Sequence, residues 1–297
     1  MSGGRTGFLL VDKPGGWTSH DVVARVRSAL SVKKVGHAGT LDPMATGLLV
    51  LGLGRATRLL RFVQAFPKEY VARILFGVAT DSLDADGAIL TREPMPVDQD
   101  VVAGAMARFV GPILQVPPMV SARRVGGHRL YELARDGVEV EREATEVTIY
   151  AFDLVEFSPC DYPEATVRVR ASAGTYVRTL ADDVARALGG RAHLTALRRI
   201  RNGSLDVAEA ATVDQITAAA AAGTAARLVL DPADGLPDIP AAVVEDDLAA
   251  AVANGVPLAG HQLEAGDGLV KLLDRGGTLL ALYRVQGARA VPEVVLS

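Results

Sequence analysis

Runs of apolar residues and regular alternation of apolar with polar residues predict several β-strands in this chain. Residues 8–12 and 46–53 are short apolar runs, which suit strands buried on both faces. Residues 70–76 predict a further strand. Residues 147–157 and 165–171 alternate instead, which is typical of strands with one buried face.

Apolar residues spaced three and four apart predict helices between these strands. Thr18 is a candidate N-cap, with Asp21 three residues later, for a helix that runs to about Leu30. Strands follow one another as often as they alternate with helices. We therefore expect an α+β fold with a mixed, mostly antiparallel sheet flanked by helices and loops. The other helical segments are residues 55–64, 99–110 and 179–188.

A change of composition before residue 240 predicts a second, smaller unit. The alanine-rich segment 217–226 and the loop 231–240 separate it from the rest of the chain. We expect a large domain over residues 1–235 and a compact, mostly β domain over residues 240–297. The elements expected in the second domain are a helix at residues 246–253 and strands at residues 269–273 and 279–285.

Composition limits the class of protein. The chain has 297 residues, of which 49% are hydrophobic, so it can bury a sizeable core. No apolar stretch approaches the roughly 20 residues of a membrane span, and we expect no membrane or targeting segment. The single cysteine, Cys160, excludes an internal disulfide framework and fits the reducing cytoplasm. The five histidines have no metal-ligand spacing, so no metal is expected.

Charge is distributed unevenly along the chain, whose formal net charge is −4. Residues 1–210 hold 26 Lys and Arg against 24 Asp and Glu, whereas residues 211–297 hold 5 against 11. The basic residues of the first part occur in clusters. A solvated surface explains any single cluster, and the set as a whole is compatible with a nucleic-acid partner.

The segment 36–47 carries the most informative candidate chemistry. It places Asp42 on a glycine-flanked loop ahead of the apolar run 46–53, and Pro43 disfavours helix at position 42. Catalytic groups are common on loops held by a rigid scaffold. Taken alone, Asp before Pro is also a common turn former, and His37 could be an ordinary hydrogen-bonding residue.

The order of several motifs resembles the pseudouridine synthases of the TruB family. Residues 36–47 are similar to the catalytic motif, in which the aspartate is the required nucleophile. Lys13-Pro14-x-Gly16-x-Thr18-Ser19 looks like the opening loop, and Tyr70 looks like the active-site tyrosine. The resemblance covers about residues 7–210 in unbroken order. Other similar segments are residues 81–87, 115–122, 127–135, 174–178 and 197–199.

This resemblance implies a pseudouridine synthase fold for residues 1–235, with an RNA-gripping insertion at about residues 115–145. It implies a PUA-like β-barrel for residues 240–297. The implied reaction converts uridine to pseudouridine at position 55 in the T loop of tRNA. The N1–C1′ bond breaks and a C5–C1′ bond forms, so no cofactor is expected, and the base must first be flipped out of its stack.

The resemblance also implies roles for individual residues. Asp42 would attack C1′ or remove the C2′ proton, and the sequence leaves that choice open. Arg178 would pair with Asp42 and hold the pKa of its carboxyl down. The remaining expected active-site residues are Tyr70, stacked on the uracil, Tyr176 in the second active-site strand, Leu197 beneath the base, and His37 near the flipped nucleotide.

Basic residues are expected to bind the phosphates of the T arm of tRNA, because structured RNA is recognised through its backbone and shape. The acidic C-terminal domain departs from this pattern, so its contact with RNA is doubtful. We expect a monomer. The residues expected to contact RNA are Lys13, Lys33, Arg58, Arg123, Arg124, Arg129, Arg198 and Arg199.

Two other classes of protein remain open. An RNA-binding protein without catalysis could use the same basic clusters, but it would not need Asp42 together with Tyr70 and Arg178. A nucleoside or glycoside hydrolase also sets carboxylates against a glycosidic carbon, and it would release free uracil. A nucleotide-binding enzyme is disfavoured, because there is no Walker A loop and residues 52–57 lack the third glycine of a dinucleotide fingerprint.

Overall fold

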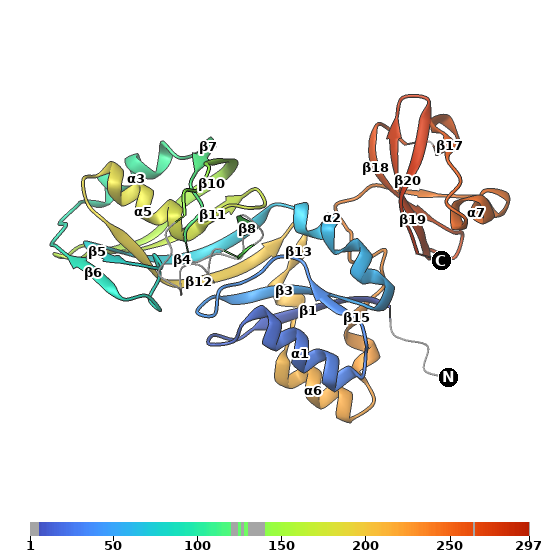
Figure 1. The fold of residues 1–297 in the computed structure, drawn as a ribbon, viewed down its shortest axis with the longest axis horizontal. Coiled ribbons are helices and arrows are strands. Elements are labelled where there is room, and N and C mark those ends of the chain that lie inside the picture. The colour runs from blue at the N-terminus through green and yellow to red at the C-terminus, as the bar shows by residue number, and fades with distance from the viewer. Residues whose placement is uncertain (1–5, 120–123, 126–127, 130–139, 264, 297) are drawn as a thin grey trace.

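One large twisted sheet organises most of the chain in the computed structural model, which describes residues 6–119, 124–125, 128–129, 140–263 and 265–296 (Figure 1). Its strands follow the spatial order β14-β1-β3-β12-β4-β11-β10-β7. These strands are β1 (Gly7–Lys13), β3 (Thr46–Leu53), β4 (Lys68–Phe76), β7 (Gly111–Gln115), β10 (Thr145–Ser158), β11 (Glu164–Ala171), β12 (Ala192–Asn202) and β14 (Ala211–Thr212).

The pairings in this sheet confirm the mixed, mostly antiparallel arrangement expected from the sequence. Only β1 with β14 and β3 with β12 pair in parallel among its described strands. Three short strands attach beside the main path: β2 (Val35–His37) on β3, β13 (Leu205–Asp206) on β12 and β15 (Val229–Leu230) on β1. Two separate hairpins pair β5 (Val78–Thr80) with β6 (Ile89–Arg92), and β8 (Arg124–Val125) with β9 (His128–Arg129).

Strand β12 lies in the middle of the sheet, although its sequence pattern does not predict a strand. It joins the two halves, pairing with β3 at Arg198–Thr46 and with β4 at Leu197–Ala72. Two register shifts interrupt its pairing with β4, and its arginines break the apolar pattern. A central strand can carry such residues only if tertiary partners satisfy them, which the sequence alone does not reveal.

Helix α1 (Ser19–Leu30) begins as predicted, with Thr18 and Asp21 forming a reciprocal capping box. The single helix expected over residues 55–64 is wrong in part, because a 3-10 helix, η1 (Gly54–Leu59), precedes the short α2 (Leu60–Ala65). No helix in the described residues could span a membrane by length and apolarity. The other helices of this part are α3 (Gln99–Ala107), α5 (Val177–Ala187), α6 (Val213–Ala221), η2 (Val207–Glu209) and η3 (Ala225–Leu228).

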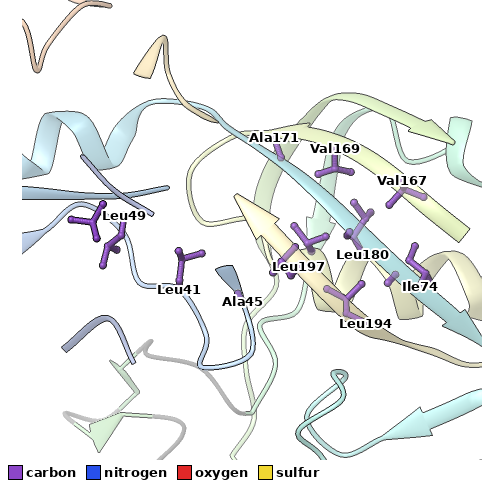
Figure 2. Packing of buried hydrophobic residues seen from close by; sticks show 14 of the residues in the cluster. Leu41, Ala45, Leu49, Ile74, Val167, Val169, Ala171, Leu180, Leu194 and Leu197 are labelled. Carbon is purple, nitrogen blue, oxygen red and sulfur yellow. The ribbon is translucent and has the colours of Figure 1, made fainter. Parts of the chain in front are cut away.

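Apolar side chains from both faces of the sheet form the core. Leu49 and Leu51 of β3 belong to one buried cluster, and Leu48 and Val50 belong to another, so β3 is apolar throughout because both its faces are covered. Figure 2 shows how Leu180 of α5 lies against the side chains of β4, β11 and β12. This packing fixes the strands that carry the candidate site.

Residues 241–295 form a second, five-stranded sheet of the PUA-like type, in the order β16-β18-β19-β20-β17. Its Leu282 and Val294 belong to the same apolar cluster as Leu59 of η1 and Val63 of α2, the helical segment that follows β3. The second sheet is therefore packed on the first part of the chain. Its elements are β16 (Ala241–Val243), α7 (Asp246–Ala253), β17 (Leu258–Ala259), η4 (Gly260–Leu263), β18 (Gly268–Leu273), β19 (Leu279–Gln286) and β20 (Arg289–Val295).

Candidate active site

A cavity of about 350 Å³ opens between the two halves of the large sheet. The loop before β3 supplies one wall and the loop between β11 and α5 supplies another, while residues of β4 and β12 also line it. A flat base of nucleotide size fits a cavity of this volume. The lining residues are Gly39, Thr40, Leu41, Asp42, Gln64, Lys68, Tyr70, Ser172, Ala173, Gly174, Thr175, Tyr176, Val177, Arg178, Leu197 and Arg199.

Lys13 holds the loop that carries Asp42. Its side chain is fully buried, and its ammonium donates to the carbonyl oxygens of Pro14 at 2.9 Å, Trp17 at 2.5 Å and Pro43 at 3.2 Å. Burial lowers the pKa of Lys13 to about 8, while Asp42 opposes that shift. The prediction that Lys13 contacts RNA is therefore not supported, because its three donors are occupied inside the protein.

Two further contacts fix the same loop. The Ser19 hydroxyl accepts a hydrogen bond from the Leu41 N–H at 2.9 Å and donates to the Leu41 carbonyl at 3.2 Å. Gly47 follows the loop with φ +98°, and a Cβ there would lie 2.2 Å from the Arg199 carbonyl oxygen. Only glycine allows β3 and β12 to approach so closely at this point.

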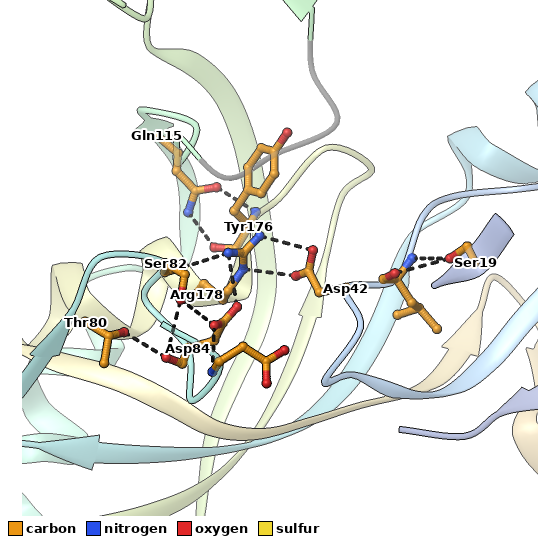
Figure 3. Close-up of polar contacts among 10 residues, drawn as sticks. Ser19, Asp42, Thr80, Ser82, Asp84, Gln115, Tyr176 and Arg178 are labelled. Carbon is orange, nitrogen blue, oxygen red and sulfur yellow. Dashed lines mark hydrogen bonds and ion pairs between the residues drawn. The ribbon is translucent and has the colours of Figure 1, made fainter. Parts of the chain in front are cut away.

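Asp42 forms a two-pronged ion pair with Arg178 in the cavity (Figure 3). The Arg178 Nε lies 3.0 Å from Asp42 Oδ2, and Nη2 donates to Oδ1 at 3.1 Å. The guanidinium also contacts Asp84 at 3.2 Å and the Ser82 carbonyl at 2.7 Å. The Arg178 side chain is 3% exposed and that of Asp42 is 33% exposed. Of the two side chains, Asp42 is therefore the one accessible from the cavity.

The pKa of the Asp42 carboxyl is raised above its usual range, contrary to the expectation that Arg178 would hold it low. Burial is the largest cause, and the nearby Asp84 adds to it. Arg178 and Lys13 oppose the shift but do not cancel it. A carboxylate that is costly to keep ionised, yet oriented by a guanidinium, is more basic than an exposed aspartate and suits a nucleophile or base.

Three other predicted residues, Tyr70, Tyr176 and Leu197, also line the cavity. His37 does not appear among the lining residues. Its ring packs edge-on against that of His20, with centroids 5.6 Å apart, and burial lowers the pKa of His37 to about 4. At neutral pH His37, the last residue of β2, is therefore uncharged.

The predicted RNA-contacting residues differ in their surroundings. Lys33 is exposed. Arg198 is half-buried and binds Asp12 through two hydrogen bonds of 2.7 and 2.9 Å. Arg199 is 1% exposed and donates to the carbonyls of Leu48 and Gly39, so it supports the cavity from inside rather than from the surface.

Exposed Arg58 donates to the Val295 carbonyl of the C-terminal sheet at 2.6 Å. Arg123 and most of the predicted insertion lie outside the described residues. Arg124 and Arg129 pair through their backbones, in the hairpin of β8 and β9.

Sequence reasoning missed three residues of this site. Asp84 lies in an acidic segment that we singled out, but nothing in the sequence joins it to Arg178. Lys68 is buried and lines the cavity, with a pKa lowered to about 7 by burial and by Arg199. Gln115 bonds the backbone of Tyr176. Among the residues described here, no group of His, Cys, Asp and Glu could hold a metal ion.

Two family models match adjoining parts of the chain, which together carry every main-path strand of the large sheet except β1. The N-terminal domain of TruB family pseudouridylate synthases matches residues 27–177, and the C-terminal domain of tRNA pseudouridylate synthase B matches residues 178–236. The chain belongs to the TruB family. Isomerisation of uridine to pseudouridine is the reaction of that family.

Named relatives of the TruB family cover most of the chain. The tRNA pseudouridine synthase B of Symbiobacterium thermophilum is 51% identical over 251 residues, which is 84% of this chain and 82% of that protein. The protein of the same name from Moorella thermoacetica is 44% identical and covers 94% of each chain. That of Mycobacteroides abscessus is 43% identical, over 98% of this chain and 96% of its own.

Solved structures confirm the pseudouridine synthase fold expected for a TruB family member. A chain of a Cbf5-Nop10-Gar1 complex superposes with a TM-score of 0.77 at 27% identity, covering 98% of this chain and 85% of that one. A chain of an archaeal box H/ACA sRNP Nop10-Cbf5 complex gives 0.75 at 25% identity, covering 98% and 86%. Both matches extend over the C-terminal sheet as well as the large one.

Proposed function

We propose that this chain isomerises uridine to pseudouridine at position 55 in the T loop of tRNA. The observation that carries the proposal is the Asp42–Arg178 ion pair, which presents a carboxylate to a base-sized cavity lined by two tyrosines. Family membership and relatives named tRNA pseudouridine synthase B support the substrate. The T-loop position follows from the resemblance of the motifs.

The proposed chemistry needs one enclosed carboxylate. Breaking the N1–C1′ bond develops positive charge at the ribose, which an ionised Asp42 stabilises. Asp42 then either bonds to C1′, in a bond that breaks again when C5 attacks C1′, or takes the C2′ proton and later returns it to C2′. The uracil turns, C5 bonds to C1′, C5 loses its proton, and N1 gains one. No electrons leave or enter, so the reaction balances without a redox partner.

The other cavity residues handle the flipped base in this proposal. Tyr70 and Tyr176 supply aromatic faces that offset part of the stacking lost when the uridine leaves the T loop. Leu197 gives an apolar floor.

We assign RNA contacts to the exposed or half-buried basic residues Lys33, Arg58 and Arg198, and to Arg123, Arg124 and Arg129 of the insertion at about residues 115–145. Binding should then weaken steeply as salt rises, because phosphate contacts release counterions. Lys13 and Arg199 act instead as internal supports.

The division that we propose is a catalytic domain at residues 1–235 and a PUA-like domain at residues 240–297. The second five-stranded sheet, contained within residues 241–295, supports it. We further propose a cytoplasmic monomer. Analytical ultracentrifugation of the purified chain, alone and with tRNA, tests the oligomeric state.

The direct test uses purified protein and a tRNA transcript with tritium at uridine C5. Release of tritium from the T loop without added cofactor is the expected result. Release of free uracil would identify a hydrolase instead. Binding without either product would identify an RNA-binding protein without catalysis.

A further inference from the structure

The side chain of Gln115 forms a two-sided clamp on the backbone of Tyr176, drawn in Figure 3. Its Oε1 accepts a hydrogen bond from the Tyr176 N–H at 2.7 Å, and its Nε2 donates to the Tyr176 carbonyl at 3.1 Å. The two partners fix the orientation of the amide, because a backbone N–H only donates and a carbonyl only accepts. Gln115 is 2% exposed, so water does not replace these bonds.

Tyr176 lies at the start of α5, where the helix bonds only its carbonyl, which accepts from the Leu180 N–H at 3.0 Å. It is the N-cap residue of α5, with extended backbone angles, and its side chain makes no capping bond. Its N–H precedes the helical ladder and has no partner within it. The Gln115 amide therefore supplies the N–H partner that the helix lacks and fixes the backbone where the chain enters α5.

The chain segment around Tyr176 also lines the cavity. Residues 172–178 all line it, and Arg178 lies two positions after the clamped residue. At the other end of this loop, the Ser172 hydroxyl accepts from the Thr148 N–H at 2.9 Å. The loop is thus tied at one end to β10 and at the other to the last residue of β7.

We propose that Gln115 is a positioning residue that places the Tyr176 ring for the reaction. This inference rests on the proposed pseudouridine synthase activity. The primary amide offers an acceptor and a donor, on two separate atoms, to the N–H and the carbonyl of one residue. An ionised acid has no donor, and an alkyl chain has neither a donor nor an acceptor. A small displacement of a group that orients a substrate costs a large factor in rate.

The test compares Gln115→Met with the wild-type chain, because methionine keeps the length and flexibility of the side chain and removes the amide. We expect the single-turnover rate at saturating tRNA to fall by about 10- to 100-fold. The dissociation constant for tRNA should change by less than about 3-fold, because the clamp does not contact phosphates. Two control variants are Gln286→Met, an exposed glutamine of the C-terminal sheet, and Val252→Ala, a buried residue of α7 that lowers stability far from the cavity.

A double-mutant cycle with Tyr176→Ala separates positioning from general damage. If Gln115 acts through the tyrosine ring, Gln115→Met should lower the rate by less than about 2-fold in the Tyr176→Ala background. An undiminished loss there would overturn the proposal. So would a wild-type-like rate in the single variant, or a loss confined to tRNA binding. Inactivity of the wild-type chain would instead reject the proposed function.

Discussion

Helix α5 takes part in two ion-pair clusters of opposite composition, each centred on one buried side chain. Near its start, one guanidinium, Arg178, contacts two carboxylates, Asp42 and Asp84. One turn later, one carboxylate, Asp182, contacts two guanidiniums, those of Arg186 and Arg191, at 2.7 Å each. Both clusters involve residues of α5, but the first has one cation for two carboxylates and the second has one carboxylate for two cations.

The carboxylates respond in opposite directions. Burial raises the pKa of Asp182, but hydrogen bonds from Arg191 and Arg186 outweigh burial and leave that pKa below its usual range. Burial raises the pKa of Asp42, and its one shared arginine does not reverse the shift. Asp182 is saturated with donors and 4% exposed, which indicates a structural role. Asp42 keeps one third of its side chain open to a cavity, which indicates a chemical role.

The largest expected effect breaks the first cluster at its reactive member. Asp42→Asn keeps the shape of the side chain and removes its charge, so turnover of the tritiated tRNA should fall by about 10⁴-fold or more. Binding of tRNA, measured by filter retention, should stay within about 3-fold of wild type. Substantial residual turnover would reject Asp42 as the catalytic carboxylate.

Removing the shared cation should damage both activity and stability. Arg178→Met leaves Asp84 buried without its partner, so the free energy of unfolding should drop by about 3 kcal/mol. The turnover rate should fall by about 10³-fold, because Asp42 loses its orientation. Arg178→Lys retains charge but not the planar fork, and it should recover stability more than rate. Urea unfolding and single-turnover kinetics on the same preparations check this, and equal recovery of both would contradict it.

The second cluster should show the reverse pattern. Asp182→Asn removes the charge that four donors share, so the free energy of unfolding should fall by about 2 kcal/mol. The rate per folded molecule should stay within about 2-fold of wild type, since Asp182 does not line the cavity. A loss of rate comparable to that of Arg178→Lys would show that the clusters are coupled.

The smallest expected effect is a difference in pH dependence. The depressed pKa of Asp182 adds stability above its unfolded value of 3.8, and this is lost as pH falls through the lower folded pKa. The raised pKa of Asp42 has the opposite sign, so its ionisation costs stability as pH rises from 3.8 through the higher folded pKa.

Urea unfolding at several pH values tests both signs. The stability of wild type relative to Asp182→Asn should increase with pH below 3.8. The stability of wild type relative to Asp42→Asn should decrease with pH above 3.8. Slopes of the same sign would contradict the assignment of opposite roles.

Much of the fold could be predicted from local pattern. The bounds of β3 and α7 and the start of α1 match the sequence expectation, because apolar runs and capping residues act locally. Strand β12 could not be predicted, because its arginines are satisfied by residues far along the chain, such as Asp12 for Arg198.

Some contacts of the candidate site could likewise be predicted from the sequence, and others could not. The pairing of Asp42 with Arg178 was expected from motif resemblance, and the structure contains it. The burial of Lys13 was not expected, because it depends on three carbonyls that converge only in the folded chain. The same holds for Gln115, whose partner lies 61 residues away. Long-range hydrogen bonds leave no periodic trace in a sequence.

The two sheets share one apolar cluster, so we expect them to unfold cooperatively. Leu236, Leu279 and Leu296 are nearly or fully inaccessible, and they pack in one cluster with Phe8 and Leu59 from the opposite end of the chain. Unfolding of the C-terminal sheet would expose apolar surface on the large domain. Unfolding of either part should therefore destabilise the other. Calorimetry should therefore record a single transition rather than two.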